Sequence, residues 1–143
     1  MIKIRHTGLV TTNLRVSIDF WVKLLKFKII SDNVEQGQLI DNVLGYKKVK
    51  VRTVKLVDEY KNGMLELLYY YNPPKLKKQK VYPYSTGFTH ISVTVKNIDK
   101  IYKKLKMKKI KFNSKPDFSA DKKVKMTYCR TPEGVFLELV QVF

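Results

Sequence analysis

The chain is 143 residues long, is 44% hydrophobic and carries a net charge of +17, so it can form one compact domain or two small halves that share a core. It holds no run of about 18 apolar residues and no signal-peptide core, and its single cysteine, Cys129, cannot form an internal disulfide, so we expect a cytoplasmic protein without a membrane span. Because 25 of its 29 basic residues are lysines spread along the chain, and nucleic-acid readout favours arginine, we expect an anionic small-molecule substrate rather than specific nucleic-acid binding.

The first half of the chain is predicted to form a strand, a helix and three further strands. Leu14, Ile18 and Trp21 recur at helical spacing after Asn13, whose side chain is a suitable N-terminal cap. Apolar runs and the polar turns between them delimit the other elements. The expected elements are a strand over 2–10, a helix over 13–25, a strand over 27–31, a loop over 32–38, a helical turn over 39–44 that ends at Gly45, and strands over 47–57 and 64–71.

Residues 73–86 form a linker, because their prolines and lysines stop both neighbouring strands. The second half then repeats the order of the first. Its expected elements are a strand over 88–95, a helix over 98–105 capped by Asn97, a strand over 109–112, a loop over 113–121, a strand over 124–130, a turn over 131–134 and a strand over 135–142. We therefore predict a single α+β domain over 1–143, made of a first module (1–72), the linker and a second module (87–143).

One histidine lies inside a strand-like stretch in each half. His90 occupies the middle of GFTHISVTV, and His6 occupies the middle of IKIRHTGLV. A single buried histidine would most simply be a hydrogen-bonded core residue. However, the two histidines are 84 positions apart, and so are the two cap residues Asn13 and Asn97. This constant separation indicates an internal duplication.

Two carboxylates occupy equivalent strands of the two halves. Glu66 lies in MLELLYY and Glu138 in VFLELVQ, each within the tripeptide Leu-Glu-Leu. Burial of an unpaired carboxylate is costly, so each must be paired with a basic side chain, protonated or bound to a cation. Two unrelated ion pairs are one explanation. The equivalent positions of two histidines and two glutamates favour a shared explanation, since imidazole and carboxylate are a ligand set for a divalent transition metal.

Four segments carry a resemblance to a known family: RHTGLVTTNLRVSIDFWVKLLKF, GMLELLYYYN, GFTHISVTVKNID and RTPEGVFLELV. Nearly the whole chain resembles the vicinal-oxygen-chelate superfamily, which includes glyoxalase I, methylmalonyl-CoA epimerase, fosfomycin-resistance enzymes and extradiol dioxygenases. The last segment is similar to the Asp-Pro-Asp/Glu-Gly turn of the family, with Thr131 in place of the first Asp. The resemblance implies paired βαβββ modules that form an open, curved, mixed sheet around a metal.

The resemblance assigns the metal ligands as His6, Glu66, His90 and Glu138. It implies one divalent ion, which would be nickel, zinc, cobalt or manganese rather than iron, and a catalytic proton carrier at Glu138 or Glu66. This ligand set is most similar to that of bacterial-type glyoxalase I. The implied activity is a glyoxalase-like lyase or isomerase that moves a proton next to a carbonyl through a metal-bound enediolate. An acyl-CoA epimerase of the methylmalonyl-CoA type, an extradiol dioxygenase, and a non-catalytic small-molecule binding or resistance protein are the alternatives.

The substrate is left open by the resemblance. Bacterial glyoxalase I typically has an arginine and an asparagine for glutathione where this chain has Val10 and Tyr70, so the thiol is unassigned. Arg52, Tyr70 and Tyr128 are candidate substrate-binding residues. The resemblance also implies a homodimer, and the metal-holding cup can form from the two halves of one chain or from modules exchanged between subunits.

Overall fold

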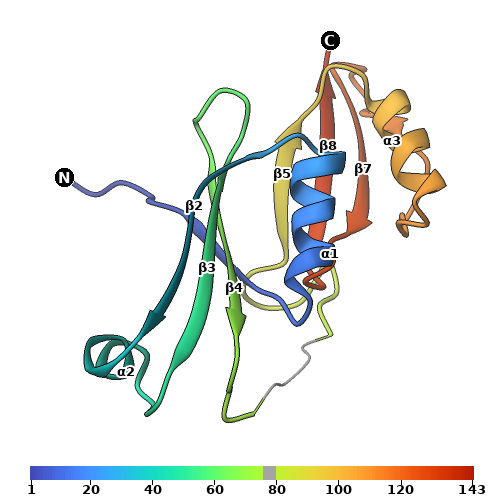
Figure 1. The fold of residues 1–143 in the computed structure, drawn as a ribbon. Helices are drawn as coiled ribbons and strands as arrows, with labels where there is room; N and C mark the ends of the chain where they lie inside the picture. The colour runs from blue at the N-terminus through green and yellow to red at the C-terminus, as the bar shows by residue number, and fades with distance from the viewer. Residues whose placement is uncertain (76–79) are drawn as a thin grey trace. The chain divides into compact units, whose positions relative to one another are not determined.

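The computed structural model describes residues 1–75 and 80–143, and the chain divides into two compact units, Met1–Lys78 and Gln79–Phe143. The boundary between the units falls within the predicted linker, of which residues 76–79 lie outside the described part. Each unit contains its own four-stranded mixed sheet (Figure 1). The predicted α+β class and the βαβββ order of each half are confirmed.

The sheet of the first unit has the strand order β1-β4-β3-β2, with β1 parallel to β4 and the other neighbours antiparallel. Its elements are β1 (Thr7–Val10), α1 (Leu14–Ile18), a π-helical continuation η1 (Asp19–Leu24), β2 (Lys28–Gln36), α2 (Gln38–Leu44), β3 (Lys50–Val57) and β4 (Met64–Tyr70). The predicted cap is confirmed, because the Asn13 side chain accepts a hydrogen bond from the Val16 backbone N–H at 3.2 Å. The end of α2 at Gly45 is also confirmed, since Gly45 adopts the left-handed conformation that favours glycine.

The sheet of the second unit has the equivalent order β5-β8-β7-β6, with β5 parallel to β8. Its elements are β5 (His90–Thr94), α3 (Ile98–Met107), β6 (Asp117–Phe118), β7 (Val124–Arg130) and β8 (Phe136–Val142). The Asn97 side chain caps α3 as predicted, by accepting a hydrogen bond from the Lys100 backbone N–H at 2.9 Å. None of the helices formed by the described residues is long and apolar enough to span a membrane.

Some segments differ from the sequence prediction. The loop predicted over 32–38 is wrong, because β2 continues to Gln36 in register with β3; its polar side chains suit a strand at the edge of a sheet. The strand predicted over 109–112 is also wrong in the described structure, where Phe112 forms only an isolated bridge with Cys129. Lys109 has a φ of 61°, which interrupts an extended run. The predicted loop over 113–121 contains the short strand β6.

Strand alternation gives each sheet one apolar face and one face that carries a carboxylate. The buried apolar face opposite Glu66 is formed by Leu9, Val54, Leu56, Leu65 and Leu67. The equivalent face opposite Glu138 is formed by Leu137, Leu139 and Cys129, and Ile98 and Leu105 of α3 are fully buried as well. Apolar burial therefore stabilises each unit from one side of its sheet and leaves the carboxylate side for other uses.

Substitution of Leu67 by alanine tests this burial pattern. Leu67 is fully buried in β4, so Leu67→Ala is expected to lower the free energy of unfolding by about 2–5 kcal/mol, as measured by urea denaturation. Leu39→Ala makes the same chemical change at a side chain of α2 that is 79% exposed, and it is expected to stay within about 0.5 kcal/mol of the parent. Equal losses in the two variants would contradict the assignment of the apolar face.

Candidate functional site

The first pair of predicted ligands is in contact within the first unit. His6 directly precedes β1 rather than lying inside a strand over 2–10 as predicted, and Glu66 lies in the middle of β4, the strand paired with β1. His6 Nε2 lies 3.1 Å from Glu66 Oε2, and the Glu66 side chain is only 12% exposed. A carboxylate so placed needs a partner of opposite charge or a bound cation.

The second pair lies within the second unit. His90 is the first residue of β5, and Glu138 lies in β8, which runs parallel to β5. His90 Nε2 lies 3.9 Å from Glu138 Oε2, and the Glu138 side chain is 16% exposed. Glu138 is therefore buried to a similar degree as Glu66 but is held at a longer distance from its histidine.

The two pairs occupy the same place in their sheets. Gly8 is aligned with Glu66 between β1 and β4, and Ser92 is aligned with Glu138 between β5 and β8. In each unit the histidine lies two residues before the aligned position, which places its side chain on the same face as the carboxylate. The duplication predicted from the sequence is thus expressed as an identical register in the two units.

The donor atoms of the first pair are spaced as two ligands of one metal ion would be. Nitrogen and oxygen ligands lie about 2.1 Å from zinc-like ions, so neighbouring ligand atoms are about 3.0–3.4 Å apart at octahedral or tetrahedral angles. The separation of 3.1 Å between His6 and Glu66 falls within this range. The separation of 3.9 Å between His90 and Glu138 is wider and requires a small side-chain adjustment. The first pair therefore fits a divalent ion in both chemistry and spacing, and the second pair fits it in chemistry.

The second ring nitrogen of each histidine has a different environment. His90 Nδ1 lies 3.0 Å from the hydroxyl oxygen of Thr89, a contact that orients the ring. His6 Nδ1 is buried and has no hydrogen-bond partner among the described residues. Histidines that bind metals usually form such an outer hydrogen bond, so the second pair has this support and the first pair lacks it.

The two carboxylates face different side chains on the next strand. Lys55 of β3 is aligned with Glu66, and its Nζ lies 3.7 Å from Glu66 Oε1. Tyr128 of β7 is aligned with Glu138, and its phenol faces that carboxylate. Burial, with a further contribution from Glu138, raises the pKa of Tyr128, so this phenol is protonated at neutral pH. Tyr128 was a predicted site residue, whereas Lys55 was not, because its position opposite Glu66 depends on the register between the strands.

The face that carries Glu66 continues toward a pair of tyrosines. Tyr70, a predicted substrate-binding residue, lies four residues beyond Glu66 on the same face of β4. Its ring centre lies 6.4 Å from that of Tyr46, and burial raises the pKa of both phenols. The Tyr46 hydroxyl is buried and has no hydrogen-bond partner within the described structure. Tyr46, which the sequence did not single out, thus offers an unused donor at this end of the face.

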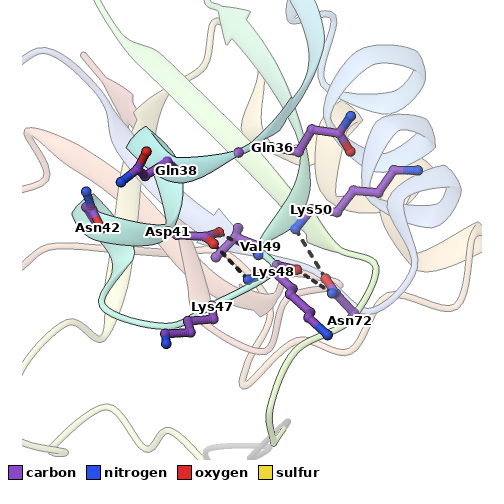
Figure 2. A pocket seen from close by; sticks show the side chains of 10 residues that line it. Gln36, Gln38, Asp41, Asn42, Lys47, Lys48, Val49, Lys50 and Asn72 are labelled. Carbon is purple, nitrogen blue, oxygen red and sulfur yellow. Dashed lines mark hydrogen bonds between the residues drawn. The ribbon is translucent and has the colours of Figure 1, made fainter.

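A polar hollow in the first unit is lined in part by residues 47–50, which directly follow Tyr46 (Figure 2). The Asp41 carboxylate accepts hydrogen bonds from the backbone N–H groups of Lys48 and Val49 at 2.9 and 2.8 Å. The Asn72 side chain accepts from the Lys50 N–H at 3.2 Å and donates to the Lys48 carbonyl. The other lining residues are Gln36, Gly37, Gln38, Asn42 and Lys47. These hydrogen bonds hold the loop before β3, and the side chains of Lys47, Lys48 and Lys50 point in different directions.

Arg52, another predicted substrate-binding residue, lies away from Glu66. It is aligned with Tyr69 of β4, which places it on the opposite face of the sheet. Its Nε and Nη2 groups donate to the Asp32 carboxylate at 2.8 and 2.7 Å. The guanidinium is therefore engaged in an ion pair that joins β2 and β3.

Within the described residues of each unit, no group of three or more His, Cys, Asp and Glu side chains converges. The structure shows two His–Glu pairs, one in each unit, on the carboxylate faces of equivalent sheets. The joint use of all four residues for one ion stays a prediction.

Comparison with known proteins places this fold in a family. Residues 3–139 match the Glyoxalase/Bleomycin resistance protein/Dioxygenase superfamily. A glyoxalase family protein from Bacillus cereus is similar in structure, with a TM-score of 0.90 and 17% identity over 100% of this chain and 95% of that chain. The trypanothione-dependent glyoxalase I of Leishmania major has a TM-score of 0.65 and 18% identity over 99% of this chain and 87% of that chain. A glyoxalase I mutant from Zea mays has a TM-score of 0.67 and 18% identity over 96% of this chain and 44% of that chain. No curated protein matches the sequence, and at these identities the solved structures show similarity of fold alone.

The Asp32–Arg52 pair predicts a pH-dependent contribution to stability. The hydrogen-bonded Arg52 guanidinium lowers the pKa of Asp32 below its ordinary value of 3.8, so the stabilisation is present above that pH and is lost as the pH falls through the lowered pKa. Asp32→Asn is expected to lower the free energy of unfolding by less than about 1 kcal/mol at pH 7, because the pair is partly exposed, and to equal the parent once the pH lies below the lowered pKa of Asp32. Glu59→Gln removes one negative charge from the exposed turn after β3 and serves as the control. A difference that grows as the pH is lowered would contradict the assignment.

Proposed function

Because the chain belongs to the Glyoxalase/Bleomycin resistance protein/Dioxygenase superfamily, we propose that it is a metal-dependent lyase or isomerase of the glyoxalase type. The reaction would move a proton between carbons next to a carbonyl group of a small substrate. The observation that supports this proposal most is the repeated register of the two His–Glu pairs in the two sheets. We further propose a cytoplasmic homodimer, as the family resemblance implies.

We assign His6, Glu66, His90 and Glu138 as the ligands of one divalent ion, which would be nickel, zinc, cobalt or manganese. When bound, such an ion acts as a Lewis acid on the oxygens of the substrate. Two imidazoles with two carboxylates differ from the set of two histidines and one carboxylate that is typical of non-haem iron oxygenases. This difference favours a lyase or isomerase over a dioxygenase.

Glu138 is the residue that we assign to carry the proton. Its distance of 3.9 Å from His90 Nε2 is longer than the 3.1 Å between Glu66 and His6. Glu66 also lies 3.7 Å from the Lys55 ammonium, with which it forms an ion pair, whereas Glu138 faces a neutral phenol. Glu66 is therefore the more firmly held ligand, and Glu138 has more freedom to approach a substrate carbon.

Metal binding by single variants tests the ligand assignment. Protein treated with a chelator and then dialysed against nickel or zinc is expected to hold about one ion per chain by elemental analysis. His6→Ala, Glu66→Gln, His90→Ala and Glu138→Gln are each expected to weaken binding by at least about tenfold, because each removes one of four ligands. Far-UV circular dichroism and thermal unfolding of each variant establish that the fold is retained.

Glu35→Gln is the matched control for these variants. Glu35 is aligned with Val51 on the same face of the first sheet as Glu66, and its carboxylate accepts a hydrogen bond from the Thr53 hydroxyl at 3.1 Å. It is not an assigned ligand, so its removal is expected to leave the metal affinity within about twofold of the parent. Loss of metal in Glu35→Gln, or retention of full affinity in both His6→Ala and His90→Ala, would contradict the site.

Turnover by Glu138→Gln tests the proton-transfer role. Hemithioacetals of methylglyoxal with several thiols and epimerisable acyl-CoA esters are screened in D₂O for deuterium incorporation next to the carbonyl. On a substrate found in this way, Glu138→Gln at saturating metal is expected to lose at least about 100-fold in kcat, since general acid–base catalysis contributes that much. Glu35→Gln is expected to retain activity. Full activity of Glu138→Gln would show that this carboxylate does not carry the proton.

A further inference from the structure

The two carboxylate sites are equivalent in register but differ in charge. In the first unit the residue aligned with Glu66 is Lys55, a cation, and in the second unit the residue aligned with Glu138 is Tyr128, which is neutral. A positive charge is thus aligned directly with the first carboxylate, and a neutral phenol with the second. The assigned ligands do not differ in this way, because each unit contributes one histidine and one glutamate.

A positive charge here has a specific chemical consequence. A divalent ion bound by two carboxylates forms a centre with no net charge, so the centre itself has little attraction for an anion. The Lys55 ammonium lies 3.7 Å from Glu66 Oε1, so an ion held by Glu66 would have this positive charge nearby. A lysine in this position supplies the charge that the neutral centre lacks.

The Lys55 ammonium is also available to a ligand. Its distance of 3.7 Å to Glu66 exceeds the hydrogen-bond range of about 2.7–3.2 Å, so the contact is an ion pair that leaves the N–H donors unused by Glu66. Its side chain is 26% exposed, whereas that of Glu66 is 12% exposed. On its other side Lys55 is aligned with Ser31 of β2, which brings no charge.

The cation of the second sheet that shares the carboxylate face of Glu138 is differently engaged. Arg130 of β7 is aligned with Phe136, and its guanidinium carbon lies 3.8 Å from the centre of that ring. Its Nη1 donates to the Gly134 carbonyl at 2.8 Å. Arg130 is thus packed on an aromatic ring and bound to the turn before β8, in contrast to Lys55.

From these contacts we propose that Lys55 is a specificity-determining residue that binds a negatively charged oxygen of the substrate beside Glu66. The substrate class is accordingly an anionic one, with a carboxylate or a similar oxyanion adjacent to the oxygens that the ion polarises. This inference rests on the proposed metal site and extends it by naming the residue that recognises the negative charge of the substrate. Lys55 recognises the substrate and is not assigned a proton-transfer step.

Binding of two probes to zinc-loaded protein, measured by isothermal titration calorimetry, tests the inference. Oxalate is a small dianion with two neighbouring oxygens, and imidazole is a neutral ligand for an open metal position. Lys55→Met is expected to weaken oxalate binding by about tenfold or more, because it removes a charged donor, and to leave imidazole binding within about twofold. Lys55→Arg, which keeps the charge, is expected to restore most of the oxalate affinity.

Lys50→Met is the matched control, because Lys50 lies on the same strand but on the opposite face, with its Nζ 5.0 Å from the centre of the Tyr71 ring. It changes the net charge equally and is expected to shift oxalate binding by no more than about twofold. Unchanged oxalate binding in Lys55→Met, or equal weakening of oxalate and imidazole, would overturn the proposal. If the parent protein binds no zinc in the same preparation, the proposed metal site fails and this inference fails with it. Zinc binding without an effect of Lys55 on oxalate refutes the inference alone.

Discussion

The constraint on which the rest of the structure depends is the burial of one carboxylate in each sheet. Glu66 and Glu138 stand within strands whose alternate side chains form the apolar face, and their own side chains are only 12% and 16% exposed. An ionised carboxylate in such a place must be compensated by charge or hydrogen bonds. In both units the first compensating group is a histidine that approaches along the parallel neighbour strand. The His–Glu pairs follow from this requirement.

Duplication explains why the pairs match, and divergence explains why their surroundings do not. The register of β1 on β4 is repeated by β5 on β8, which keeps each histidine beside its glutamate. The next strand contributes Lys55 in one unit and Tyr128 in the other. This difference between the two units is the basis for the proposed role of Lys55 in binding an anion.

The sequence was most informative where a polar residue interrupts an apolar strand. Glu66, Glu138, His6 and His90 could be identified in this way, because a polar residue in an apolar run is exceptional; the glutamates are buried as expected, whereas the His6 and His90 side chains are 28% and 42% exposed. The full length of β2 could not be predicted, since an edge strand tolerates polar residues that also suit a loop. The role of Lys55 required the register between β3 and β4, which a strand pattern does not specify. Tyr46 depended on the hydrogen bonds that fix the loop before β3, which have no sequence signal.

The central proposal is that one ion is bound by both His–Glu pairs. It is tested most directly by the zinc K-edge X-ray absorption spectrum of protein loaded with one equivalent of zinc. The account predicts a first shell of nitrogen and oxygen atoms at about 2.0–2.1 Å, together with the outer-shell scattering of two imidazole rings. Scattering from a single imidazole would show that the ion uses only one of the two pairs. A sulfur ligand at about 2.3 Å would show that Cys129 is one of the zinc ligands, which is not part of the proposed set. Either result would contradict the account.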